Sequence, residues 1–241
     1  MPAYAIIAET LWQPPMETII LRVPYYLDFA APLAILLWLA AIVLALSLHE
    51  FCHALAATLL GDQTARLAGR LSLNPLVHVD PLGMVMAVVA GFGWARPVPF
   101  NPYNLRVQQW GPTLVAVAGP VSNFLQATVA GIAIRLATGA GVPESNLLMI
   151  FLGYYFLINV GLFFFNLLPI PPLDGSKFLL DLLAGPQYAR ARFFLETKGP
   201  LILLLILSLQ YLIGISVFGI LFSLVYRYIF FPLFGIVVQV L

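Results

Sequence analysis

The side chains best suited to chemistry in this chain lie in His49-Glu50-Phe51-Cys52-His53, an H-E-x-x-H motif. Residues four apart share one face of an α-helix, so both imidazoles can reach a single metal ion. Glu50 can accept a proton from a water molecule activated by that metal. The motif lies inside a long apolar run, where an ionised group is costly unless it is paired or functional. We therefore interpret it as a catalytic metal site and not as a coincidence of composition.

A catalytic zinc ion takes three protein ligands and keeps a fourth position open. Asp174 lies at an unusual break in an apolar stretch, in the sequence N-L-L-P-I-P-P-L-D-G of residues 166–175. The prolines cannot continue a helix interior, and Gly175 permits a tight turn. An unwound segment of this kind can direct a carboxylate sideways at a neighbouring helix. The sequence thus predicts one zinc ion per chain, with His49, His53 and Asp174 as ligands and Glu50 as the general base.

The elements that position these residues belong to a membrane protein. Of the 241 residues, 62% are hydrophobic and 9% charged, whereas a soluble domain carries about 25% charged residues. The net charge of +1 gives no argument for a nucleic-acid partner. The single cysteine, Cys52, excludes an intramolecular disulfide framework and is expected to pack rather than to bind the metal.

We expect an all-α polytopic membrane protein, with a lipid bilayer around about five to six transmembrane helices. An N-terminal extension, 1–28, would precede a single catalytic core, 29–241. The extension does not look like a cleavable signal, because Arg22 and several prolines interrupt it. The predicted spans are approximately Phe29–Leu60, Thr113–Ala137, Leu147–Leu168, Pro200–Ile215 and Val217–Val240.

The apolar run Leu82–Trp94 is too short to span a bilayer and is rich in glycine, so we predict that it is re-entrant. This topology places the segments 61–111 and 170–199 on the same side of the membrane. Eight of the eleven basic residues then lie on that side, which the positive-inside rule makes cytoplasmic. A full crossing by Leu82–Trp94 would instead divide the basic residues between both faces. The preferred topology brings the active site towards the cytoplasmic side.

The paired motifs H-E-F-C-H and N-x-x-P-x-P-P-x-D-G resemble the site-2 protease family of intramembrane zinc metalloproteases. Segments such as 69–75, 93–99 and 118–123 look like its short bacterial branch. The resemblance implies a minimal core without a PDZ or nucleotide-sensing domain, in a bacterial plasma membrane. It implies the same three zinc ligands, with Glu50 as general base. Substrates would be single-pass or hairpin membrane proteins, among them anti-sigma factors, sigma-factor precursors and leftover signal peptides.

Three asparagines are weaker candidates for oxyanion stabilisation or for binding the substrate backbone: Asn123, Asn166 and Asn74. The alternative for Asn123 and Asn166, and for Asn159, is hydrogen bonding between helices, which is common in membranes. His78 is expected to be a structural hydrogen-bonding residue, because a fourth protein ligand would close the open zinc position.

Residues 66–74 alternate apolar and polar side chains, as a β-strand does, and Val98–Asn101 also looks extended. One of these short membrane-associated strands would offer an edge to an unwound substrate; the alternative is an ordinary interfacial hairpin. The sequence as a whole predicts a zinc-dependent intramembrane endopeptidase. The alternative function is a non-catalytic zinc-binding membrane protein or a metal transporter. A transporter would need polar residues along several spans, and a structural zinc site would not need Glu50.

Overall fold

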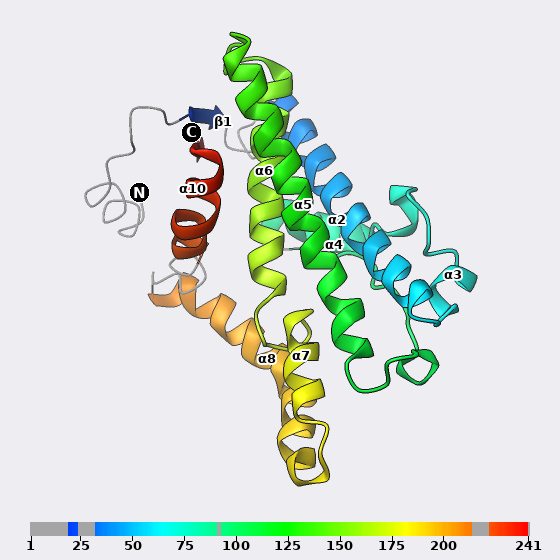
Figure 1. Cartoon of the computed structure of the whole chain (residues 1–241). Coiled ribbons are helices and arrows are strands. Elements are labelled where there is room, and N and C mark those ends of the chain that lie inside the picture. Colours follow the sequence, from blue (N-terminus) through cyan, green and yellow to red (C-terminus); the bar gives the residue numbers. More distant parts are fainter. Residues whose placement is uncertain (1–18, 24–31, 91–92, 214–221, 241) are drawn as a thin grey trace.

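The computed structural model describes residues 19–23, 32–90, 93–213 and 222–240, and most of them are helical (Figure 1). The helices are α2 (Pro32–Leu59), α3 (Thr64–Leu67), α4 (Pro81–Ala90), α5 (Gly111–Gly139), α6 (Leu147–Asn166), α7 (Gly175–Leu182), α8 (Ala189–Ile213) and α10 (Phe231–Phe234). Short turns of other helix types are η1 (Pro75–Val77), η2 (Pro102–Asn104), η3 (Pro186–Tyr188) and η4 (Tyr226–Phe230). The strands β1 (Ile19–Val23) and β2 (Ile236–Val240) form one parallel pair.

Three of the described helices, α2, α5 and α6, are long and apolar enough to cross a membrane. They have 28, 29 and 20 residues, so at about 1.5 Å per residue each reaches at least roughly 30 Å. These three confirm the spans predicted near Phe29–Leu60, Thr113–Ala137 and Leu147–Leu168. The helices lie side by side (Figure 1), and α5 contacts both of the others.

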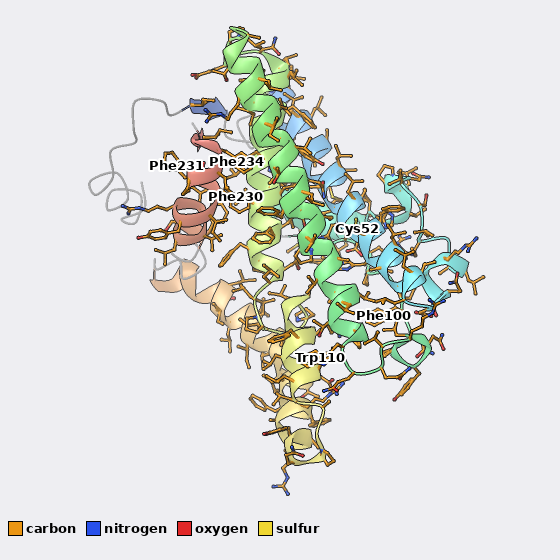
Figure 2. The ribbon with its side chains drawn as sticks, viewed as in Figure 1. Cys52, Phe100, Trp110, Phe230, Phe231 and Phe234 are labelled. Carbon is orange, nitrogen blue, oxygen red and sulfur yellow. The ribbon has the colours of Figure 1, made fainter. Side chains whose placement is uncertain are left out.

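Small side chains allow these helices to approach closely. The buried small residues include Ala41, Ala45, Ala54 and Ala57 of α2, and Gly119, Ala127 and Ala130 of α5. Helices in lipid gain stability from close van der Waals packing, because the bilayer is as apolar as a leucine side chain. Rings of the C-terminal segment complete the core. Phe230 and Phe234, labelled in Figure 2, both lie edge-on to Phe156 of α6.

The helices found near the last two predicted spans, Pro200–Ile215 and Val217–Val240, differ in length and position from the prediction. The run expected at Pro200–Ile215 belongs to α8, which begins at Ala189 and continues through Pro200. The start of the run expected at Val217–Val240 lies outside the described residues. Its described part is a shorter apolar helix, Phe222–Phe234, followed by β2. A total of five to six crossings therefore stays a prediction.

The segment Leu82–Trp94 returns to its starting point. The helix α4 begins at Pro81, just after Val79, and Val79 forms an antiparallel bridge with Ala95. The amide of Arg96 also donates a hydrogen bond to His78 O at 2.7 Å. The two ends of a membrane crossing would lie roughly 30 Å apart. These contacts argue against a full crossing, and the re-entrant form stays a prediction.

The predicted strand at residues 66–74 is wrong. The helix α3 occupies its beginning, and Gly69 then reverses the chain at a φ of 70°. The bent segment that follows is held by hydrogen bonds from Arg70 to Val77 O and from His78 Nε2 to Ser72 O, the latter at 2.8 Å. Residues 98–101 have no strand partner in the described part of the chain. The observed strands β1 and β2 lie near the chain ends instead, and β1 falls within the predicted extension 1–28.

Polar contacts gather at the end of the three-helix bundle where α2 stops and α5 starts. Buried Asp62 accepts hydrogen bonds from Thr64 N, Thr64 Oγ1, Asn101 N and Asn104 Nδ2. Burial raises the pKa of Asp62, but these hydrogen bonds outweigh that effect and leave its pKa below the ordinary value. Asp181 of α7 accepts from both the amide and the hydroxyl of Thr113, in the first turn of α5. Segments that the topology assigns to the cytoplasmic side therefore meet at one end.

Candidate metal centre

The helix α2 brings together the two histidines of the H-E-x-x-H motif. His49 and His53 are one turn apart and buried, and their Nε2 atoms are 3.0 Å from each other. The turns before and after them expose apolar side chains such as Leu44 and Leu59, so the motif lies within an apolar helix. At 1.5 Å per residue, His49 is about 15 Å from the Leu59 end of the helix and about 25 Å from the Pro32 end.

Asp174 reaches the histidines because the chain unwinds after α6. That helix ends at Asn166, and the proline-rich segment 167–174 leads directly into α7. Gly175 lies so close to the preceding turn that a Cβ there would be 2.2 Å from Leu167 O. Asp174 Oδ2 consequently lies 3.2 Å from His49 Nε2 and 3.3 Å from His53 Nε2. The structure thus brings together the three predicted ligands, whose ligand atoms all lie within 4.8 Å of one another.

Hydrogen bonds from the Nδ1 atoms of the two histidines orient the rings so that each Nε2 atom faces Asp174. His49 Nδ1 lies 2.6 Å from Asn123 Oδ1, and His53 Nδ1 lies 2.8 Å from Val115 O. A carbonyl oxygen only accepts, so each Nδ1 carries the proton and each neutral ring presents its Nε2 lone pair to the other ligand atoms. Asp174 Oδ2 is buried without a hydrogen-bond donor in the described part of the chain. A metal cation between these three atoms would accept an electron pair from each of them.

The spacing of these three atoms fits zinc. A tetrahedral zinc ion with ligand distances of about 2.0–2.2 Å separates its ligand atoms by roughly 3.3–3.5 Å. The observed separations of 3.0, 3.2 and 3.3 Å are close to that value. Two imidazoles and a carboxylate form a donor set of a catalytic zinc site. The metal-ligating cluster of the described residues has three members, so a fourth position remains for water or substrate.

Gly119 of α5 forms the wall behind the imidazoles. A Cβ at this position would be 2.4 Å from His53 Nε2 and 2.5 Å from His49 Cε1. Ordinary carbon contacts are about 3.5–4.0 Å, so only glycine allows α5 to lie against both rings. The sequence reasoning gave Gly119 no role. The available signal was a glycine followed by proline inside an apolar span.

A cavity of about 900 Å³ adjoins the three ligands. Glu50 lines it, beside the metal cluster but not part of it. Its walls are mainly apolar and come from α2, α6 and the segment after α4. The polar side chains at the wall include Asn166 and Lys177, and Lys177 lies one turn beyond Asp174 on α7. The cavity can therefore hold a largely apolar ligand with one polar region next to Glu50.

Comparison with known proteins agrees with this site. The profile of peptidase family M50 matches residues 131–207, which contain Asp174 but not the H-E-x-x-H motif. The chain is 39% identical over 166 residues to the "Putative zinc metalloprotease YwhC" of Bacillus subtilis, covering 67% of this chain and 75% of that protein. The chain belongs to peptidase family M50, the site-2 protease family.

Two further relatives carry similar names. The "Putative zinc metalloprotease Rip2" of Mycolicibacterium smegmatis is 30% identical over 178 residues, which are 71% of this chain and 66% of that protein. The "Protease RseP" of Photorhabdus luminescens is 35% identical over 170 residues, which are 58% of this chain and 75% of that protein. No solved structure matches the chain significantly. The names of two of these three relatives describe a zinc metalloprotease, and the name of the third describes a protease.

The asparagines predicted for this M50 site have three different environments. Asn166 lines the cavity and donates from Nδ2 to Leu162 O at 3.1 Å. Asn123 is fully buried behind His49, between the imidazole and Asn159, which favours a positioning role over oxyanion stabilisation. Asn74 is exposed, accepts a hydrogen bond from Leu76 N at the start of η1, and does not line the cavity. Of these three asparagines, only Asn166 lines the cavity, and a substrate-binding role stays a prediction.

His78 has the structural role predicted for it. It is fully buried, and its Nε2 lies 2.8 Å from Ser72 O. Asn159 likewise bonds across helices, as expected for a polar residue inside a span. The sequence gave no indication of which helix would supply its partner.

Proposed function

We propose that this chain is a zinc-dependent intramembrane endopeptidase that hydrolyses peptide bonds within or next to transmembrane segments. The observation that carries the proposal is the convergence of Asp174 with His49 and His53 of the apolar helix α2, next to a cavity lined by Glu50. Titratable groups at membrane depth are costly and mark functional sites. A structural metal site would have no use for Glu50 at the cavity wall.

His49 and His53 would hold zinc through Nε2, and Asp174 through Oδ2. When bound, zinc supplies Lewis-acid polarisation of the scissile carbonyl and makes a water molecule more acidic. Glu50 accepts the proton of the attacking water and later donates it to the leaving amine. Asn166, at the cavity wall, is the residue we assign to contact the substrate backbone. The mainly apolar lining lowers the local polarity, which strengthens each polar interaction inside.

The cavity walls also favour an apolar substrate. Trp38 and Ile42 of α2 line one side and Ile158 and Leu162 of α6 another, so the cavity extends along the spans away from Glu50. A transmembrane segment of a single-pass or hairpin protein fits such walls. The resemblance to site-2 proteases adds anti-sigma factors and sigma-factor precursors as candidates. We place the protein in the bacterial plasma membrane, with five to six crossings and the site towards the cytoplasmic side.

The test is cleavage by the purified protein of a panel of transmembrane peptides, with and without a zinc chelator. We expect cleavage that the chelator abolishes and that stoichiometric zinc restores, with about one zinc per chain. The variant Asp174→Ala should lose both zinc and cleavage. Zinc retention without cleavage of any peptide would favour the structural-metal alternative. Cleavage that persists after complete zinc removal would contradict the proposal.

A further inference from the structure

A chain of buried hydrogen bonds runs from α6 to the metal centre without touching the cavity. Asn159 is fully buried in the middle of α6 and does not line the cavity. Its Nδ2 donates to Tyr155 O at 2.9 Å, and its Oδ1 accepts from Asn123 Nδ2 at 2.7 Å. Asn123 Oδ1 then lies 2.6 Å from His49 Nδ1. Two amides thus connect a backbone carbonyl to a predicted zinc ligand.

The carbonyl oxygen of Tyr155, at the end of this series of hydrogen bonds, sets the direction of every bond in the series. Tyr155 O can only accept, so Asn159 must turn its amide nitrogen towards it and its oxygen towards Asn123. Asn123 must then donate to Asn159, which leaves its own oxygen facing His49. The Nδ1 of His49 must donate in turn, and its Nε2 lone pair faces Asp174 Oδ2. A reversed amide at either position would bring two acceptors or two donors together.

We propose that Asn159 is a positioning residue that acts through Asn123 to fix the tautomer and orientation of His49 for zinc binding. The inference rests on the zinc centre proposed above. Residues that orient a metal-ligating histidine contribute about 10- to 100-fold to metal affinity when they are mutated. Asn123 is the direct hydrogen-bond partner of His49, and Asn159 contacts His49 only through Asn123. The effect of Asn159 passes through the orientation of the Asn123 side-chain amide. The hydrogen bond to Asn159 favours the orientation in which the Asn123 oxygen faces His49.

The same helix pair contains a second buried hydrogen bond that serves as a control. Tyr155 Oη donates to Gln126 Oε1 at 2.5 Å, and this bond also joins α6 to α5. Gln126 is buried and has no hydrogen bond to a metal-ligating residue. Gln126→Met removes one bond between these helices and none of the three hydrogen bonds that run from Tyr155 O to His49. If Asn159 only holds α5 and α6 together, the two positions should behave alike.

The experiment measures zinc affinity of the purified full chain by competition with a chelator, together with the visible absorption spectrum of the cobalt-substituted protein. Asn159→Leu should weaken zinc binding by about 10- to 100-fold and alter the cobalt bands. Gln126→Met should stay within about threefold of the wild type, below that range. Thermal unfolding of each metal-free variant checks that it is folded.

Two results would overturn the inference alone. One is wild-type zinc affinity and an unchanged cobalt spectrum in Asn159→Leu. The other is equal weakening by Gln126→Met, which would make Asn159 an ordinary interhelical contact. A wild-type protein that binds no zinc would instead overturn the zinc centre, and the inference with it.

Discussion

Replacing Gly119 by alanine adds one methyl group at the point where α5 touches both imidazoles. The new Cβ would lie 2.4 Å from His53 Nε2 and 2.5 Å from His49 Cε1 and His53 Cε1. Carbon atoms in ordinary contact are about 3.5–4.0 Å apart, so the rings or the helices must move by roughly 1 Å. Both rings are buried but also line the cavity, so the displacement is expected to carry them towards it and out of their present positions.

A shift of this size is large for a metal site. Ligand distances in zinc sites vary by about 0.2 Å, so a displacement of roughly 1 Å removes at least one imidazole from the coordination sphere. We expect zinc affinity to fall by at least about 100-fold, the upper end of the effect of orienting residues. Overpacking costs about 1–3 kcal/mol of stability, which the higher helix propensity of alanine offsets by about 1 kcal/mol. The variant should therefore fold and lose zinc.

The assay compares zinc affinity and metal-free thermal stability in Gly119→Ala and in Gly131→Ala. Gly131 lies on the same helix, about 18 Å further along, and a Cβ there would lie 2.8 Å from Phe234 Cδ1. Both substitutions overpack α5, but only the first does so against ligands. We expect Gly131→Ala to lower stability and leave zinc affinity unchanged. Zinc bound by Gly119→Ala with wild-type affinity would refute the geometry described for the site.

Two further predictions concern the end of the bundle near Asp62, and a third concerns the membrane topology. Asp181→Asn should lower the unfolding free energy by about 1–3 kcal/mol, because it weakens hydrogen bonds from the first turn of α5 to a carboxylate; an unchanged midpoint of chemical unfolding would argue against this contact. The lowered pKa of Asp62 means that its stabilising contribution is present above the unfolded-state pKa of about 3.9 and is lost as pH falls through the lower folded-state value. Thermal unfolding from pH 6 to pH 3 should therefore show less acid sensitivity in Asp62→Asn than in the wild type, and equal sensitivity would contradict it. Cysteine labelling in intact cells should place positions 63 and 190 on one side of the membrane and Glu144 on the other; labelling of 63 and 190 from opposite sides would contradict the re-entrant segment.

The parts of this site that follow from local sequence rules could be predicted. The i, i+4 spacing of His49 and His53 fixes their common face as soon as the segment is helical. The prolines before Asp174 end α6 by chemistry that depends on no other part of the chain. The re-entrant segment follows from its length and from the charges around it. Each of these predictions needs only the local geometry of the backbone and the known thickness of a bilayer.

Other features depend on contacts between distant residues and could not be predicted from one sequence. Asn123 and Asn159 were recognisable as buried amides, but their pairing across α5 and α6 required the helix positions. The alternation in residues 66–74 indicated a strand, yet the hydrogen bonds of Asp62 start the short helix α3 and Gly69 ends it. The pairing of β1 with β2 joins opposite ends of the chain, for which neither strand contains a local signal. The boundary predicted between residues 28 and 29 stays a prediction.

The variant Glu50→Gln tests the central claim most directly, because it separates metal binding from proton transfer. Glutamine keeps the size and hydrogen bonding of the side chain but cannot accept a proton as a carboxylate does. The measurement is the single-turnover cleavage rate of a transmembrane peptide that the wild type cuts, with the zinc content of the same sample. We predict retained zinc and a rate lower by at least about 100-fold, the scale of general acid–base catalysis. Cleavage at the wild-type rate by the zinc-loaded variant would contradict the account.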